Sequence, residues 1–258
     1  MEPVFFAKEF ENKNFSNHIV FICDHASNYI PRKYRKLGIS DSDLESHIAF
    51  DIGAKNLTIN LAKKLKQSYF LSNFSRLLID PNRKKTDTEL IKVRSFGVEI
   101  PENLHISTQE REYRINFFYN YYHKNLGNFV KKKINKYKKV FLVSIHSFTK
   151  KSKNLNRGIE VGLLWNKTMG LLLPIQRNLK DNKIHFGRNY PYSGFHYNYT
   201  IDRLYRNFYL ENITIEIRND LICDQKGIKK YVSLMSNIFK EFLNEKKPWN
   251  GKYRSRRV

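Results

Sequence analysis

Apolar and polar residues alternate along the chain with two different periodicities. Runs rich in apolar or β-branched residues predict buried strands, and they cover residues 18–23, 75–80, 140–145, 159–164 and 213–217. Longer segments with apolar residues at helical spacings predict amphipathic helices, and they cover residues 44–67, 108–136, 169–179 and 227–243. Such alternation indicates an α/β fold, a three-layer sandwich in which helices cover both faces of a twisted, mainly parallel or mixed sheet.

Ionisable side chains stand at the carboxyl ends of three predicted strands. Asp24 and His25 follow the first strand, Asp80 closes the run over residues 75–80, and His146 follows residues 140–145. Ligands of open α/β sheets bind in the crevice beyond these strand ends. We therefore expect these side chains to line one cleft, and two histidines at one sheet edge favour a metal site.

A single acid interrupts the last predicted strand. Glu216 lies within residues 213–217, which are otherwise apolar or β-branched. Strand alternation places Glu216 and Arg218 on the face opposite the isoleucines. A buried carboxylate costs several kcal/mol unless a cation or metal compensates it. Glu216 is thus predicted to serve the metal site, or to pair with Arg218.

Length and composition suit one large globular domain over residues 1–258. Hydrophobic residues make up 41% of the 258 positions and aromatic residues 14%, enough for a substantial core. The 47 basic and 24 acidic residues give a formal net charge of +23, which raises nucleic acid as a partner. Because the basic residues are spread along the chain, we expect no specific nucleic-acid recognition, and a basic surface would attract small anionic substrates.

The two cysteines, Cys23 and Cys223, are too few for a disulfide framework and are expected to be free thiols. The first ten residues lack the apolar core of a signal peptide, and no apolar run is long enough to cross a membrane. The sequence therefore predicts a cytoplasmic protein without membrane association.

Several motifs together resemble the N-formylglutamate amidohydrolase family, which is related to the zinc carboxypeptidases. They are CDHASNYIP (residues 23–31), HIAFDIGA (47–54), SRLLIDPNR (75–83), HSFT (146–149), NYPYSG (189–194) and IEIRNDL (215–221). Each string alone is weak, but all occur in one order over roughly residues 18–243. The resemblance implies an α/β sandwich of the phosphorylase/hydrolase-like type and a zinc-dependent hydrolase of linear amides.

The resemblance implies that His25 and His146 bind Zn²⁺. Zinc needs a further ligand, and the carboxypeptidase position for it is occupied here by Asn28, a poor zinc ligand. Asp51, four residues after His47 on the same predicted helical face, is the favoured carboxylate. Asp24 remains a competitor, and Asp51 could instead orient a ligating imidazole.

The resemblance also implies roles for the remaining residues. Glu216 matches a general base that takes a proton from water and passes it to the leaving amine. Asn82 and Arg83 resemble a pair that grips a substrate carboxylate, with Arg218 as a further candidate, and Arg76 could stabilise the oxyanion. A turn-stabilising Asn82 and a surface arginine are the alternatives.

The function expected from these residues is hydrolysis of an N-acyl amino acid, with N-formylglutamate, formate and glutamate as the family's substrate and products. One alternative is a deacylase or peptidase that acts on another N-acyl amino acid or peptide with the same metal core. Another is a non-catalytic, basic nucleic-acid-binding protein on a hydrolase scaffold. The acyl group, the selected side chain, the resident metal and the oligomeric state stay open.

Overall fold

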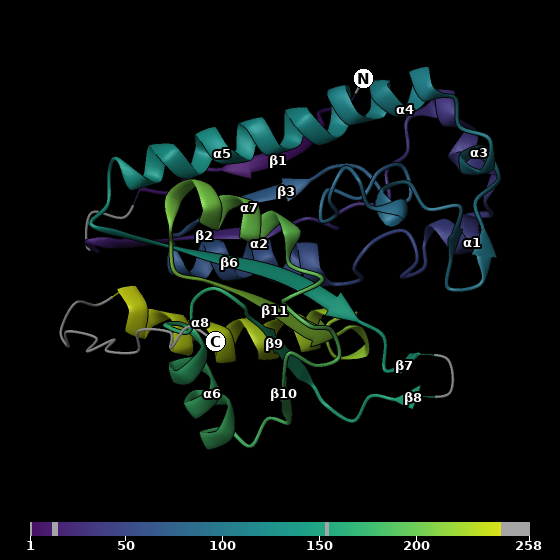
Figure 1. The fold of residues 1–258 in the computed structure, drawn as a ribbon. Helices are drawn as coiled ribbons and strands as arrows, with labels where there is room; N and C mark the ends of the chain where they lie inside the picture. The colour runs from purple at the N-terminus through teal and green to yellow at the C-terminus, as the bar shows by residue number, and fades with distance from the viewer. Residues whose placement is uncertain (1, 12–14, 153–154, 244–258) are drawn as a thin grey trace.

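A mixed sheet of seven strands runs through the centre of the molecule (Figure 1). The computed structural model describes residues 2–11, 15–152 and 155–243. The sheet order is β1-β3-β2-β6-β11-β9-β10, in which β3, β2, β6 and β11 are parallel and β1 and β9 run antiparallel to their inner neighbours. The strand bounds, in sheet order, are Phe5–Lys8, Ser68–Ser72, Asn17–Cys23, Lys139–Phe148, Asn212–Arg218, Val161–Leu164 and Phe186–Arg188.

Helices cover both faces of this sheet, as the alternating pattern predicted. Residues of α2, α6 and α8 share one apolar core with the sheet, and residues of α5 and α7 share the other. These helices span Ala54–Leu65 (α2), Leu172–Asp181 (α6), Gln225–Leu243 (α8), Tyr121–Ile134 (α5) and Tyr199–Phe208 (α7). The α/β three-layer fold with a mostly parallel sheet is thus confirmed. Within the described residues, no helix is both long and apolar enough to cross a bilayer.

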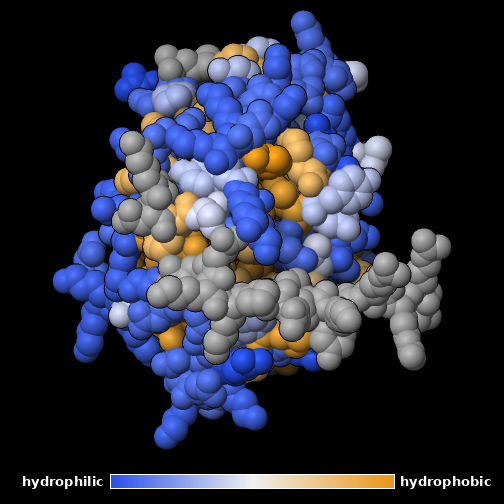
Figure 2. Space-filling view, turned by 90° about the vertical axis from the view of Figure 1, so that its left-hand side faces the viewer, coloured by the Kyte–Doolittle hydropathy of each residue, from blue (hydrophilic) through white to orange (hydrophobic). Residues whose placement is uncertain are grey.

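Short helices and hairpins lie in the segments that connect these strands and helices. The helical ones are α1 (Asp41–Leu44), α3 (Pro101–Leu104), α4 (Thr108–Arg114) and the 3-10 turns Arg32–Gly38, Thr88–Leu90 and Asn219–Leu221. Two small hairpins are β4 (Arg94–Ser95) with β5 (Val98–Glu99), and β7 (Lys151–Ser152) with β8 (Leu155–Asn156). On the face in Figure 2, hydrophilic residues predominate and apolar ones show in small areas.

The helix predicted over residues 44–67 is interrupted. The chain forms α1, then turns through residues 45–53, and only then enters α2. Gly53 ends the turn with φ +81°, and a Cβ on it would come within 2.2 Å of the Ile222 carbonyl oxygen. Only glycine fits this close approach and left-handed backbone. Asp51 therefore lies in a turn, and its expected position on a helical face was wrong.

The predicted strand over residues 75–80 is also wrong. This segment is an irregular loop, and the strand of this region is β3, a few residues earlier. Its backbone bonds go to scattered partners, with Ser75 N donating to the Tyr29 carbonyl and Asp80 N to the Leu90 carbonyl. Leu77, Leu78 and Ile79 are all fully buried, although their backbone pairs with no strand. A buried loop therefore has the same apolar run in its sequence as a buried strand.

The predicted helix over residues 108–136 is present but contains a π-helical turn. α4 continues through Ile115–Asn120, a π-helical segment, into α5. The strands predicted at residues 140–145 and 213–217 correspond to β6 and β11, and both are longer than expected. His146 is therefore part of a strand instead of a loop, and Arg218 is the last residue of β11.

Candidate active site

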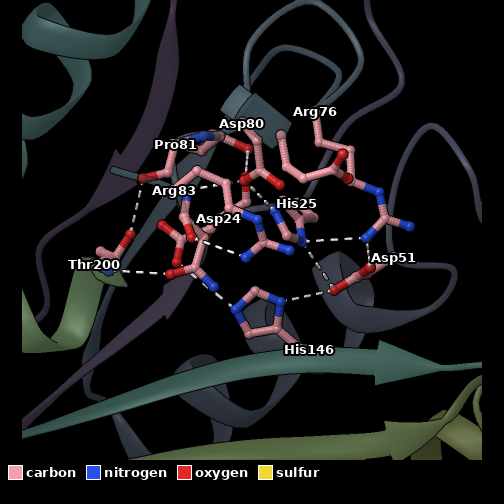
Figure 3. Close-up of polar contacts among 12 residues, drawn as sticks. Asp24, His25, Asp51, Arg76, Asp80, Pro81, Arg83, His146 and Thr200 are labelled. Carbon is pink, nitrogen blue, oxygen red and sulfur yellow. Dashed lines mark hydrogen bonds and ion pairs between the residues drawn. The ribbon is translucent and has the colours of Figure 1, made fainter. Parts of the chain in front are cut away.

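Two histidines from neighbouring strands converge on one carboxylate (Figure 3). His146 Nδ1 lies 2.8 Å from Asp51 Oδ2, and His25 Nδ1 lies 3.5 Å from the same oxygen. One ligand atom from each of the three residues lies within 4.8 Å of the others, and all three residues are buried. The geometry brings together the two histidines and the carboxylate that the sequence favoured as metal ligands.

Each of the three residues has a local reason to be there. His25 follows the end of β2, and His146 lies near the end of β6, its parallel neighbour. Asp51 N donates to the His25 carbonyl at 2.9 Å, which ties the turn before α2 to the loop after β2. The Ser147 amide donates to Asp51 Oδ2 at 3.2 Å. Backbone contacts therefore hold the carboxylate between the two strands.

The second ring nitrogen of each histidine faces another buried acid. His25 Nε2 lies 2.8 Å from Asp80 Oδ1, and His146 Nε2 lies 3.7 Å from Asp24 Oδ2. Asp24 Oδ1 in turn accepts a hydrogen bond from the Tyr122 hydroxyl at 2.8 Å. A carboxylate on the far nitrogen fixes the tautomer and orientation of a metal-binding imidazole. Asp24, considered as a ligand in competition with Asp51, faces the other ring nitrogen of His146 from the one that Asp51 contacts.

Neighbouring charges strongly shift the pKa values of Asp51 and of both histidines. Burial alone would raise the pKa of Asp51, but the neighbouring Arg76 and His25 hold that pKa well below its usual range. Burial alone would lower the pKa values of both histidines, yet Asp80 and Asp51 raise that of His25, and Asp24 and Asp51 raise that of His146. Without a metal, the carboxylates thus favour protonated imidazoles.

Each nitrogen of the Arg76 guanidinium makes a hydrogen bond at this site. Nη1 donates to Asp51 Oδ1 at 3.0 Å, and Nε donates to the Ile48 carbonyl at 3.0 Å. Nη2 donates to the His47 carbonyl. Arg76 therefore fixes the turn that carries Asp51, and this arrangement makes it a positioning group as much as a candidate for oxyanion stabilisation.

Glu216 lies beside His146 across the sheet. The parallel register of β11 and β6 pairs Glu216 with His146, and on its other side β9 presents Gly162. A Cβ on Gly162 would come within 2.5 Å of the Tyr190 carbonyl oxygen and 3.2 Å of Glu216 Cβ, so the row has no room for a larger residue. The isoleucines of β11 belong to the opposite core, as the strand alternation predicted.

Glu216 is buried and forms no ion pair with any residue that the structure describes. Its side chain lines the cleft, and its Oε2 is buried without a hydrogen-bond partner among the described residues. Burial raises the pKa of Glu216 to about 7, despite the opposing effect of His146. Arg218 does not pair with it, because Arg218 Nε donates to Asp220 Oδ1 at 2.7 Å. A carboxyl group with a pKa near neutrality suits a general base.

These groups form one end of a cleft of about 870 Å³. Its walls combine basic groups with aromatic ones. The lining includes His25, His47, Asp51, Arg76, Asn82, Arg83, Lys84, Lys92, Phe96, His146, Lys167, Tyr192, Phe195, Tyr197, Arg206 and Glu216. His25 and His146 line this cleft as expected, whereas Asp24 and Asp80 are not part of its lining and contact the two imidazole rings instead.

The expected substrate-binding residues separate into two groups. Asn82 and Arg83 line the cleft, with the Arg83 guanidinium 5.0 Å from the Tyr197 ring centre. Asn82 also has a structural task, since its Nδ2 donates to the Tyr197 carbonyl and its Oδ1 accepts from Thr200 N. Arg218 lies outside the cleft lining and binds Asp220 and the Ile159 carbonyl. The substrate-binding role expected for Arg218 therefore stays a prediction without support from this cleft.

Sequence reasoning missed other residues of the site. Tyr122, which supports Asp24, lies on a long helix where its aromatic character indicated only core packing. Gly162 gave no signal beyond an interruption of an apolar strand. The aromatic lining of Phe96, Phe195 and Tyr197 comes from connecting loops, for which periodicity makes no prediction.

Comparison with known proteins gives an independent view of this geometry. The family model described as N-formylglutamate amidohydrolase matches residues 17–223. A crystal structure of a gene product from Agrobacterium tumefaciens is 28% identical, covers 93% of this chain and 94% of its own, and superposes with a TM-score of 0.86. The N-formylglutamate amidohydrolase of Ralstonia eutropha JMP134 is 17% identical over 93% of this chain and 97% of its own, with a TM-score of 0.71. No curated protein matches the sequence.

Proposed function

This chain belongs to the N-formylglutamate amidohydrolase family, and from that membership we propose that it hydrolyses the amide of an N-acyl amino acid with a zinc ion held by His25, Asp51 and His146. The family makes the protein an amidohydrolase; its metal and substrate are part of the proposal. The observation that carries it is the buried His-Asp-His cluster at the end of a large cleft, beside a buried glutamate.

The chemistry of the cluster fits a divalent cation. Four buried carboxylates surround the two histidines; among the described residues Arg76 forms an ion pair with one of them, and Arg83 acts on Asp80 from farther away. The carboxylates are those of Asp24, Asp51, Asp80 and Glu216. Burying excess negative charge is costly unless a cation offsets it. Glu216 Oε2 is buried without a hydrogen-bond partner among the described residues, which supports a site built around a further charge. His146 Nε2 and Asp24 Oδ2 also lack a hydrogen bond there, although they face each other at 3.7 Å.

Bound zinc would supply a Lewis acid that polarises the scissile carbonyl and favours ionisation of water. The protein side of the reaction then falls to Glu216, beside His146. In its ionised form it would take a proton from the attacking water and deliver it to the amide nitrogen. The acyl carbon gains the water oxygen, the C–N bond breaks, and a carboxylic acid and a free amino acid leave.

The substrate's own carboxylate would lie near Arg83. A guanidinium binds a carboxylate through two parallel hydrogen bonds, and stacking on Tyr197 restricts its orientation. The carboxyl group of Asp87 is 4.0 Å from Arg83 Nε, too far to compete strongly. This arrangement supports a small anionic N-acyl amino acid as the substrate class.

The test combines metal analysis with an activity assay. Protein purified without chelators is expected to carry about one zinc per chain, and to release free amino acid from an N-acyl amino acid panel that includes N-formylglutamate. Removal of the metal should abolish turnover, and added Zn²⁺ should restore it. Fully active protein after complete metal removal would disprove the zinc assignment. Metal-loaded protein inactive on the whole panel would disprove the proposed reaction.

Replacement of Arg83 by alanine should raise KM for a carboxylate-bearing substrate by about 10- to 100-fold, with a smaller change in kcat. The physical reason is that a charge-assisted clamp acts in both the ground state and the transition state. Steady-state kinetics on the metal-loaded protein measures both constants.

Two further variants sharpen this measurement. Arg83→Lys keeps the charge and loses the planar fork, so its KM should be intermediate. Arg94→Ala removes an exposed arginine outside the cleft lining and should leave KM unchanged. An unaltered KM in Arg83→Ala would move the carboxylate to another cation of the cleft, such as Arg206.

A further inference from the structure

An exposed aromatic residue stands at the tip of the β4–β5 hairpin, on the wall of the cleft. Ser95 pairs with Val98, so Phe96 and Gly97 form a two-residue connection. Both have positive φ, 49° for Phe96 and 88° for Gly97. Hairpins of this kind favour Asn-Gly, because a bulky side chain in the left-handed region is strained. Phe96 is therefore a costly residue for this turn.

The hairpin gains no compensating burial from this phenylalanine. Phe96 is 57% exposed, although it lines the cleft. Its ring centre lies 6.0 Å from that of His47, and His47 Nδ1 lies 3.9 Å from Asp51 Oδ1. His47 thus lies between Phe96 and Asp51 of the proposed metal site. Backbone strain at such a place is a reason to look for a functional contact.

Further aromatic side chains with the same character line the cleft. Phe195, from the loop before α7, is 60% exposed and packs edge-on against Trp165, with ring centres 6.3 Å apart. Tyr197 is 44% exposed and lies over Arg83. The cleft therefore offers apolar surface near both the metal cluster and the proposed carboxylate clamp.

The cleft is also large for the family's substrate. Its volume of about 870 Å³ lies near the upper end of the roughly 300–1,000 Å³ found for pockets that enclose drug-sized ligands. N-formylglutamate is much smaller and is hydrophilic at both ends. It would leave Phe96 and Phe195 exposed to water.

We propose that the preferred substrate is an N-acyl amino acid with an apolar group that packs on Phe96 and Phe195. This inference rests on the proposed function and narrows its substrate class. The apolar group could be the amino-acid side chain or the acyl chain, since both flank the scissile amide. Burying it against two phenyl rings gives binding energy that a formyl-glutamate cannot provide.

The test compares three substrates on the metal-loaded, full-length protein. They are N-formylglutamate, N-formylphenylalanine for an apolar side chain, and N-hexanoylglutamate for an apolar acyl chain. We expect kcat/KM for one of the two apolar substrates to exceed that for N-formylglutamate by about tenfold or more. The better of the two identifies the source of the apolar group.

Phe96→Asn is the decisive variant, because asparagine tolerates the left-handed turn. It should raise Tm by about 2–4 °C through relief of strain, while kcat/KM for the apolar substrate falls by about 10- to 100-fold. The loss for N-formylglutamate should be about tenfold smaller. Phe195→Ala should reproduce the substrate-dependent loss from the other aromatic, without the gain in Tm.

Tyr209→Asn is the matched control. Tyr209 is also an exposed aromatic residue with positive φ, 54°, but it lies outside the cleft lining. This variant should share the relief of strain and leave the substrate preference unchanged. Equal losses on all three substrates in Phe96→Asn would overturn the inference, and so would a change of oligomeric state in light scattering, which would assign Phe96 to an interface between copies. A wild-type protein that prefers N-formylglutamate overturns the inference alone; one inactive on all three substrates overturns the proposed function with it.

Discussion

Replacing Glu216 by glutamine is expected to lower kcat by about 10²- to 10⁴-fold, the usual contribution of a positioned acid–base group. Glutamine preserves the volume and one acceptor oxygen but cannot take a proton from water. The tight row from His146 to Gly162 should accept this near-isosteric change, so the fold should persist. Steady-state kinetics, zinc content and thermal melting of the same preparation measure the three quantities together.

Glu211→Gln provides the control for this experiment. Glu211 is also a partly buried glutamate whose pKa is raised by burial, but it accepts a hydrogen bond from Gly170 N and lies outside the cleft lining. Its replacement should leave kcat unchanged. If Glu216→Gln lost its zinc along with its activity, Glu216 would be a metal ligand and the base would have to be found elsewhere in the cleft.

Replacing Asp51 by asparagine should lower zinc affinity by more than about 100-fold, and activity with it. Asp51 Oδ2 is the oxygen shared by both histidines, whereas Asp80 and Asp24 face their outer nitrogens. Loss of an outer carboxylate typically weakens metal binding about 10- to 100-fold. Asp80→Asn and Asp24→Asn should therefore show smaller losses, measured by competition with a chromogenic chelator.

These three variants distinguish a carboxylate that binds the metal from one that only orients a metal-binding histidine. Because Asp51 also pairs with Arg76 at 3.0 Å, its replacement should destabilise the turn before α2. Circular dichroism and melting of the metal-free variants measure that effect separately. A larger loss of affinity in Asp24→Asn than in Asp51→Asn would make Asp24 the ligand. Equal losses in all three variants would show that the site responds to total negative charge alone.

The layered fold was predictable from the sequence because buried strands and helices show a local pattern of apolar residues. The strands β2, β6 and β11 are apolar where they pack against helices. Their apolar residues lie close together in the sequence and can therefore be recognised there. The same kind of pattern led to the wrong strand prediction at residues 75–80, where Leu77, Leu78 and Ile79 are buried in a loop. Apolar residues in the sequence indicate burial. They indicate a strand only where the backbone also pairs regularly with a neighbouring strand.

The sequence by itself also determined that His25 and His146 stand at the ends of two strands and that Glu216 interrupts an apolar strand. Only the tertiary structure decided their partners. Asp51 meets His146 across 95 residues and Asp80 meets His25 across 55, while Arg218 turned away to Asp220. Strand register and the Gly53 turn set these distances. Periodicity cannot encode them, because it describes neighbours along one element, whereas a metal site depends on atoms that separate elements bring within a few ångströms of each other.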